Sequence, residues 1–169
     1  TWPSAVSSSS SRGKISYAVE HPTTFITYNT NNYDWYYSSD TSTDDTRWQS
    51  TKTIYDPCPA GWRVPDGGSN GVWNKAGFYD QSYDLFDEGT LFGSGISSPE
   101  TWYPLAGCRS SYDGYLCETG YLGYYWSVTP SDYGYYACRL SLYNNDNVDP
   151  TDDVHGSRAL GQSVRCLQE

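Results

Sequence analysis

The chain has 169 residues, a length that suits one domain with a hydrophobic core of its own. Its net charge of -10 argues against nucleic acid and anionic membranes as partners, because both require basic residues that neutralise phosphate. No run reaches the ~20 apolar residues of a membrane helix, so we expect no membrane insertion by this domain. The chain also lacks Met and begins with a serine-rich stretch. We therefore expect a piece of a longer protein, with residues 1–13 as a linker and residues 14–169 as the folded domain.

Aromatic residues carry much of the apolar content, with 18 Tyr, 7 Trp and 4 Phe beside 16 Gly. This composition favours an α+β chain of short strands, one or two short helices and long loops. Alternating or β-rich runs predict strands, in chain order, over residues 14–19, 25–28, 123–128, 135–143 and 162–167. Helix signals are confined to residues 70–76, with a further single turn expected over residues 98–102.

The fourth of these expected strands has two distinct faces, because side chains alternate along a strand. Leu140 and Leu142 share one face, which we expect to be buried. Arg139, Ser141 and Tyr143 share the other face, which we expect to lie at the surface. This strand is therefore predicted to carry both core and surface residues.

Five cysteines in an acidic chain rich in Tyr, Ser and Asn indicate an oxidising compartment. We therefore expect an extracellular or cell-surface location. No two cysteines have the close spacing of zinc ligands, so we expect no structural zinc. Cys108 and Cys117 flank a hairpin-type turn at residues 113–114 and are predicted to pair across it, which leaves Cys138 outside a disulfide. A bridge between Cys108 and Cys138 is the alternative.

Three segments carry a resemblance to a known family. Residues 52–65 read Lys-Thr-Ile-Tyr-Asp-Pro-Cys-Pro-Ala-Gly-Trp-Arg-Val-Pro, residues 123–127 read Gly-Tyr-Tyr-Trp-Ser, and residues 161–166 read Gly-Gln-Ser-Val-Arg-Cys. Together they resemble the Fibrobacter succinogenes major paralogous domain of Bacteroidetes surface proteins. The resemblance implies a C-type-lectin-like fold, similar to that of formylglycine-generating enzymes, and display on a bacterial surface, a pilus or a phage particle.

The first and the last of these segments each contain one cysteine. Two prolines beside Cys58 make residues 56–59 a rigid extended corner, because each proline fixes φ. We expect a disulfide between Cys58 and Cys166 that ties this corner to the last strand. Such a bridge closes a long loop and therefore contributes strongly to stability.

Residues 127–161 contain no Lys, Glu, Gln, Met or Trp and are rich in Tyr, Asn, Asp and Ser. This is the residue set obtained when the two adenines of the Asn codon AAC are randomised. The run therefore resembles the variable region of a diversity-generating retroelement target, a class of protein with C-type-lectin-like folds. The alternative is a loop region of fixed sequence in an ordinary Tyr-rich and Asn-rich surface domain.

We expect the part of this run between residues 131 and 157 to form an exposed ligand-binding surface. Tyr offers a large contact area with few rotatable bonds, and Ser and Asn add adaptable hydrogen bonds, as in antibody combining sites. The expected ligand-binding residues are Ser131, Asp132, Tyr133, Tyr135, Tyr136, Arg139, Ser141, Tyr143, Asn144, Asn145, Asp146, Asn147, Asp149, Asp152, Asp153 and His155. Under diversification Cys138 and Ser157 vary with them, whereas Leu140 and Leu142 belong to the framework.

The sequence offers no constellation for catalysis, so we expect a binding protein and not an enzyme. Its only histidines are His21 and His155, and the second lies in the variable run. Residues 149–151 read Asp-Pro-Thr in place of the calcium motif of sugar-binding lectins. We therefore expect no cofactor, with a structural calcium ion as the minor alternative.

The expected partner is a protein or a glycan on another cell or a host surface, beside neighbouring domains of the parent protein. Two alternatives stay open. The first is a structural assembly domain of a pilus or cell surface without a ligand of its own. The second is a metal-independent glycan-binding domain of fixed specificity.

Overall fold

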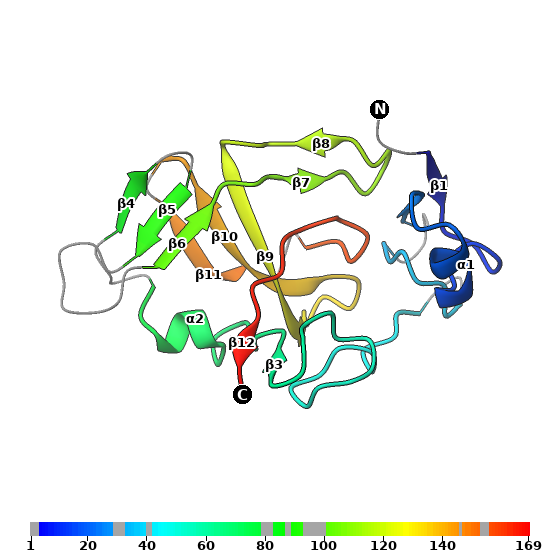
Figure 1. Ribbon diagram of the computed structural model, residues 1–169, viewed down its shortest axis with the longest axis horizontal. Coiled ribbons are helices and arrows are strands. Elements are labelled where there is room, and N and C mark those ends of the chain that lie inside the picture. The colour runs from blue at the N-terminus through cyan, green and yellow to red at the C-terminus, as the bar shows by residue number, and fades with distance from the viewer. Residues whose placement is uncertain are drawn as a thin grey trace.

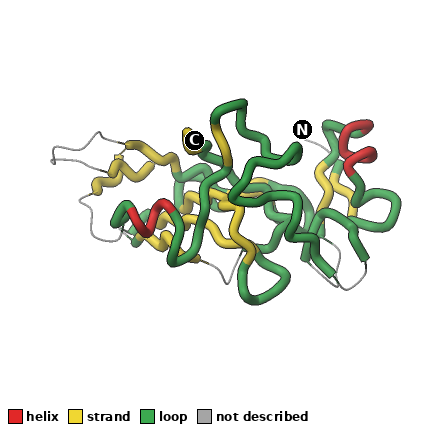
Figure 2. The backbone as a smooth tube through the Cα atoms, turned by 90° about the horizontal axis from the view of Figure 1, so that it is seen from below, coloured by secondary structure: helices red, strands yellow, loops and turns green. Residues whose placement is uncertain are grey.

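The computed structural model describes residues 4–28, 33–39, 42–78, 83–86, 89–92, 101–145, 147–152 and 156–169. The helices in these ranges are α1 (Ile15–Glu20) and α2 (Val72–Lys75). The strands are β1 (Ala5–Ser7), β2 (Phe25–Thr27), β3 (Trp62–Arg63), β4 (Tyr83–Phe86), β5 (Gly89–Phe92), β6 (Thr101–Pro104), β7 (Cys108–Arg109), β8 (Leu116–Cys117), β9 (Leu122–Pro130), β10 (Ala137–Tyr143), β11 (Val148–Asp152) and β12 (Leu167–Gln168). They form several small sheets joined by long loops, in agreement with the predicted α+β class (Figures 1 and 2).

The central element is a three-stranded antiparallel sheet in the order β11-β10-β9. Leu140 and Leu142 of β10 are fully buried on the face predicted to point inward. The long strand β9 is rich in aromatic and β-branched residues, which fit a pleated surface packed on other elements. The predicted strands over residues 123–128 and 135–143 are therefore confirmed, although β10 begins only at Ala137.

Aromatic rings fill the core that lies against this face. Phe78 stacks on Phe92 of β5, with ring centroids 4.1 Å apart. Tyr103 of β6 meets Tyr125 of β9 edge to face, with centroids 4.9 Å apart. Trp73 of α2 donates its indole N–H to the Tyr103 hydroxyl at 3.2 Å, so a polar group of these large rings finds a partner inside the core. Rings from four elements thus replace the aliphatic side chains that the composition lacks.

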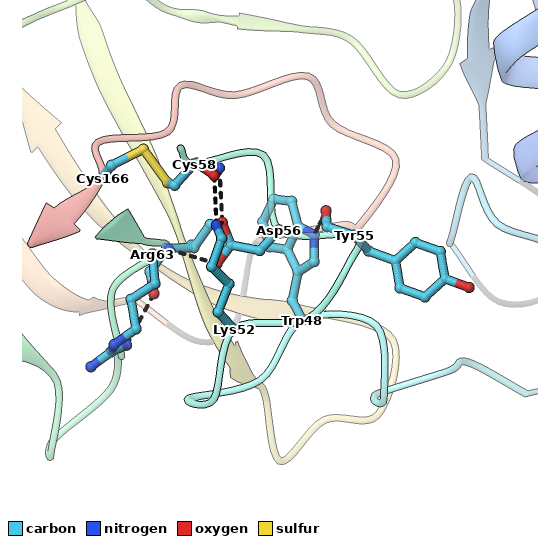
Figure 3. Close-up of a disulfide and its surroundings, with 8 residues drawn as sticks. Trp48, Lys52, Tyr55, Asp56, Cys58, Arg63 and Cys166 are labelled. Atoms are coloured by element: carbon cyan, nitrogen blue, oxygen red, sulfur yellow. Dashed lines mark hydrogen bonds and ion pairs between the residues drawn. A yellow bond between two sulfur atoms is a disulfide. The ribbon is translucent and has the colours of Figure 1, made fainter. Parts of the chain in front are cut away.

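A second apolar cluster surrounds the Cys58–Cys166 disulfide, which confirms the predicted pairing (Figure 3). The two Cα atoms are 5.8 Å apart. Val64 and Val128 are buried beside the bridge. Strand β12 pairs with β3 next to it, so the end of the chain is held to the corner by backbone hydrogen bonds as well as by the disulfide.

The carboxylate of Asp56 is buried at the same corner and accepts hydrogen bonds on both oxygens. Its Oδ1 accepts from the backbone N–H of Cys58 at 2.8 Å and from Lys52 Nζ at 2.9 Å, and its Oδ2 accepts from the backbone N–H of Val64 at 3.0 Å. Burial raises the pKa of Asp56, but these hydrogen bonds and the Lys52 charge outweigh burial and hold the pKa below its ordinary value. One ionised side chain therefore fixes the chain before and after the two prolines.

Strands β7 and β8 form a hairpin that carries the second disulfide, Cys108–Cys117. This confirms the favoured pairing, and the alternative bridge to Cys138 is wrong. Cys138 is buried on β10, outside both disulfides. Two disulfides indicate an oxidising, extracellular environment. Within the described ranges, no helix has the length and apolar character needed to cross a membrane.

The N-terminal region departs from the prediction. Residues 14–19 were expected to form a strand, but from Ile15 onward they lie in α1, in which no residue is buried. These residues pair with neither strand of the small β1–β2 sheet; their backbone closes helical hydrogen bonds instead, from the Ala18 N–H to the Lys14 carbonyl at 3.1 Å and from the His21 N–H to the Tyr17 carbonyl at 2.9 Å. Strand β1 lies within the expected linker of residues 1–13, so the described part of that segment packs on the domain and does not extend away from it.

The remaining expectations have mixed outcomes. The helix expected over residues 70–76 is confirmed as α2, and the strand over 25–28 as β2. The single turn expected over 98–102 is wrong at its end, which belongs to β6, and its first three residues lie outside the described ranges. The strand expected over 162–167 is reduced to a bridge at Ser163 and the start of β12.

We expect the two disulfides to contribute unequally to stability. The Cys58→Ala/Cys166→Ala variant should lose about 4.8 kcal/mol of unfolding free energy, because its bridge spans a sequence separation of 108. The Cys108→Ala/Cys117→Ala variant should lose about 2.6 kcal/mol, because its bridge spans a separation of 9. Urea denaturation of both variants measures the difference. Equal losses would contradict the expectation that the disulfide closing the longer loop contributes more to the unfolding free energy.

We also expect Asp56→Asn to lower the unfolding free energy by about 2–4 kcal/mol near neutral pH, because an amide keeps only one acceptor oxygen and faces one of the two buried N–H donors with an NH2 group. Since the folded pKa of Asp56 is lowered, its contribution is complete above the unfolded value of about 3.9 and disappears as pH falls through the folded pKa. Urea titrations across this range should therefore show the wild type and Asp56→Asn converging at acid pH. Asp113→Asn, at an exposed turn, is the matched control, and a constant gap at all pH values would refute the assignment.

Candidate ligand-binding surface

The residues predicted to bind a ligand do not form one exposed surface. They lie on β10, on β11 and in the loops at the two ends of β10, which are roughly 20 Å apart along a strand of 7 residues (Figure 1). Asp132, Tyr133, Tyr135, Asn144, Asn145 and Asn147 are exposed; Tyr136, Tyr143 and Asp149 are half-buried; Ser131, Arg139 and Ser141 are buried. Asp146, Asp153 and His155 lie outside the described residues, as does the side chain of Asp152. The expectation of exposure is therefore wrong for Ser131, Arg139 and Ser141.

Arg139, Ser141 and Tyr143 nevertheless share the predicted face of β10, opposite the core face. Arg139 lies across from Trp126 on β9, and Ser141 lies across from Tyr124, so these pairs belong to one side of the sheet. Arg139 and Ser141 are only 5% and 0% exposed. They are buried because other parts of the chain cover this second face as well. The β7–β8 hairpin is one of these parts.

A groove of about 460 Å³ lies between the hairpin and this second face, and we call it the sheet–hairpin groove. The sheet contributes Tyr124, Arg139 and Tyr143 to its lining, and the hairpin contributes side chains between Cys108 and Glu118. Its volume lies in the range of small-molecule and side-chain pockets. The predicted surface face is therefore one wall of a groove and not an open sheet.

Three charged or polar groups are fixed in this groove. The Arg139 guanidinium lies over the Tyr124 ring, 4.0 Å from its centroid, in a cation–π contact. The Tyr124 hydroxyl donates to Glu118 Oε2 at 3.0 Å. Burial raises the pKa of Tyr124 far above its ordinary value; Arg139 opposes this shift and the bond to Glu118 adds to it, so the hydroxyl stays protonated at neutral pH. The groove therefore holds a cation, an anion and a neutral hydroxyl in fixed positions, with the hydroxyl proton already donated to Glu118.

A row of tyrosine rings continues from the groove across the surface. It consists of Tyr112, Tyr28, Tyr33, Tyr135 and Tyr136, and we call it the tyrosine row. The ring of Tyr112 meets Tyr28 edge to face at 4.9 Å, and Tyr28 stacks on Tyr33 at 5.3 Å. Tyr33 in turn lies 6.1 Å from Tyr135 and 6.2 Å from Tyr136. Tyr112 also lines the groove, so the row and the groove form one continuous surface.

The backbone at Tyr33 is held in an unusual conformation. Its φ of 54° lies in the left-handed region, which is uncommon for a residue other than glycine. The carbonyl of Tyr33 accepts hydrogen bonds from Ser157 Oγ at 2.8 Å and from the backbone N–H of Ala159 at 3.3 Å. These bonds to a distant part of the chain hold the middle of the tyrosine row in place.

Sequence reasoning missed the part of this surface that comes from outside residues 131–157. Tyr28, Tyr33 and Tyr112 lie far from that run in sequence, and no local pattern distinguishes them from the other tyrosines. Glu118 and Tyr124 were missed for the same reason. Only the tertiary packing brings these residues beside Tyr135 and Arg139.

The site offers polar recognition and aromatic contact. Among the residues that the structure describes, no group of three His, Cys, Asp or Glu side chains converges in a way that would hold a metal ion. Comparison with known proteins gives no further guide, since no family model, no curated protein and no solved structure matches the chain. The resemblance carried by residues 52–65, 123–127 and 161–166 therefore stays a prediction.

Proposed function

We propose that this domain binds a macromolecular ligand, a protein or a glycan, without changing it chemically. The ligand lies along the tyrosine row and places a polar group in the sheet–hairpin groove. The observation that carries this proposal is the continuous contact of five tyrosine rings from three separate segments of the chain. Tyr112 and Tyr135 keep 73% and 41% of their surface exposed, so their rings are accessible to a partner.

The chemistry of this surface fits recognition. Tyrosine adds a large contact area at a low cost in side-chain entropy, and its hydroxyl forms hydrogen bonds, which explains its prominence in combining sites. Neighbouring rings restrain one another, so less freedom is lost on binding than for isolated side chains. Arg139 and Glu118 provide fixed charges for orientation. Interface hot spots are enriched in Tyr and Arg, the residue types found here.

The resemblance to the Fibrobacter succinogenes major paralogous domain supports display on a bacterial surface, a pilus or a phage particle. It also supports a C-type-lectin-like fold. The two disulfides agree with such a location, because they persist in oxidising compartments. We accordingly propose an adhesion module of a surface protein.

A direct test compares binding of labelled wild-type domain and the variant Tyr112→Ala/Tyr135→Ala. The probes are a glycan array and cultured epithelial cells, with the cells treated in parallel by protease or by glycosidases to separate protein from glycan ligands. We expect the variant to bind at least about tenfold more weakly, since tyrosine hot spots are worth about 2 kcal/mol or more. Its unfolding free energy should stay within about 1 kcal/mol of the wild type, because both side chains are exposed.

Tyr121→Ala is the matched control, because this tyrosine is 64% exposed and lies outside the row and the groove. Wild-type binding is expected for it. Undiminished binding by the double variant would contradict the proposal, as would an equal loss in the Tyr121→Ala control.

We also propose that this surface is diversified. Sequencing the coding region for residues 120–169 across a population of the source organism should then reveal substitutions at adenine-bearing codons for exposed or groove-lining residues such as Tyr135 and Tyr143. Leu140, Leu142 and Ser141 should be spared, because all three are completely buried. A uniform segment would refute diversification and leave a binding surface of fixed specificity.

A further inference from the structure

The basic side chains of this chain are mostly withdrawn from its surface. The sequence has 10 Lys and Arg residues, and all of them lie within the described ranges. Among them only Lys75 and Arg165 are exposed, and the others are half-buried or buried. The chain carries a net charge of -10, so its exposed charge is dominated by carboxylates. The position of the two exposed cations therefore decides which faces carry negative charge alone.

Both exposed cations lie outside the tyrosine row and the sheet–hairpin groove. Lys75 is the last residue of α2, and Arg165 donates to the carbonyl of Trp102 on β6 at 2.6 Å. In Figure 1, α2 and β6 lie toward one end of the long axis of the molecule, whereas β1 lies at the other end. Strand β2 pairs with β1, and Tyr28 follows β2 as a member of the row. The end of the row at Tyr28 and Tyr112 is therefore remote from both cations.

Exposed carboxylates accompany the row instead. Asp113 directly follows Tyr112, and Asp132 lies in the loop that carries Tyr135. Glu118 lines the sheet–hairpin groove. All three acidic residues are exposed. The charge that a partner meets beside these tyrosines is therefore negative, and complementary charges at an interface select the partner and speed its approach.

The arginines beside this surface do not reverse its charge. Arg139 lies over the Tyr124 ring and is only 5% exposed. Arg158 lies 2.5 Å from the Asp45 carboxylate and donates from Nε to the carbonyl of Tyr136 at 3.2 Å. The first cation is covered by the protein, and the second is paired with a carboxylate that is itself 55% exposed. Negative charge therefore prevails at the surface of the row and the groove.

Tyrosine rings in this chain already take arginine as a stacking partner. The Arg47 guanidinium, for example, lies 4.0 Å from the centroid of the Tyr36 ring. A guanidinium is planar and weakly hydrated, so it stacks on an aromatic ring and can pair with a carboxylate at the same time. Tyr112 is 73% exposed, and the exposed Asp113 follows it in the chain. Both groups belong to one turn, within the reach of a single arginine side chain of a partner.

We propose that the partner at the tyrosine row is a basic segment of a protein. Its arginine side chains stack on the exposed tyrosine rings and pair with Asp113, Asp132 and Glu118. This inference rests on the proposed function and narrows its ligand from a protein or a glycan to a cationic protein. An acidic glycan would be repelled by the three carboxylates, and a neutral glycan would gain no long-range attraction from them.

Three peptides of equal length test the proposal on the intact chain. In a Gly-Ser background, the first carries several arginines, the second carries glutamines in their place and the third carries glutamates. Fluorescence anisotropy of the labelled peptides measures their affinity for the wild type. We expect saturable binding of the arginine peptide, and binding at least about tenfold weaker for the other two. Raising the salt concentration from about 0.05 M to about 0.3 M should weaken binding of the arginine peptide severalfold, because exposed charges are screened.

Two variants locate the binding surface. Asp113→Asn/Asp132→Asn should bind the arginine peptide about fivefold more weakly, because two attractive charges are lost while the side chains keep their shape. Tyr112→Ala/Tyr135→Ala should bind it about tenfold more weakly, because the stacking rings are lost without any change in charge. Both pairs of residues are exposed, so the fold tolerates the changes.

The variant Glu20→Gln/Glu169→Gln is the matched control. Both glutamates are exposed and lie outside the row and the groove, and their replacement removes the same charge as that of Asp113 and Asp132. Its affinity for the arginine peptide should stay within about twofold of the wild type, because screened charges away from the contact contribute little. An equal loss in this control would mean attraction to the net charge of the chain alone and would refute the proposal.

Two results with the wild type would also overturn the proposal. They are the absence of saturable binding of the arginine peptide, and equal or tighter binding of the glutamine or glutamate peptide. Neither result depends on how a variant folds. The proposed function is judged separately, by binding to cells or to the glycan array that is lost in Tyr112→Ala/Tyr135→Ala. If that binding persists while the arginine peptide fails, the surface has a ligand and only the basic class of partner is wrong.

Discussion

The corner held by the Asp56 carboxylate and the Cys58–Cys166 disulfide positions the rest of the domain. The two act side by side: one fixes the local path of the chain, and the other joins that path to the C-terminal segment. Both joined segments then bond to β9, whose backbone N–H groups donate to the carbonyls of Pro65 and Ser163, each at 2.9 Å. The strand on which the central sheet is built is therefore clamped between two segments that a covalent bond keeps together. An ionised carboxylate and a disulfide at one place make this clamp sensitive to both acid and reductant.

Tyrosine serves two opposite purposes in this chain. In the core, Tyr125 packs against Tyr103 and donates its hydroxyl to the carbonyl of Pro104 at 2.7 Å, so a polar atom is buried with a partner. At the surface, Tyr112 and Tyr135 leave their rings partly exposed. The difference lies in what surrounds each ring and not in the residue type. A chain poor in aliphatic residues thus builds a packed interior and an aromatic exterior from the same side chain.

The sequence predicted those features that depend on local pattern or on a motif. The Cys58–Cys166 bridge follows from two motif segments, and the alternation of Leu140 and Leu142 identifies the core face of β10. The burial of Arg139 could not be predicted, because it depends on a hairpin that packs against the opposite face of the sheet. The tyrosine row was also hidden, since its members meet only through tertiary contacts. Likewise, the helix α1 replaced a predicted strand, because a strand needs a neighbour to pair with and residues 15–20 join no sheet, which no local pattern reveals.

The sheet–hairpin groove shares one lining residue with a second hollow of about 500 Å³ that lies beside Trp126. That residue is Leu160, which stands in the loop between the central sheet and β12. A movement of its side chain therefore changes the lining of both hollows at once. A single leucine thus makes the shape of the groove beside the hairpin depend on the packing around Trp126.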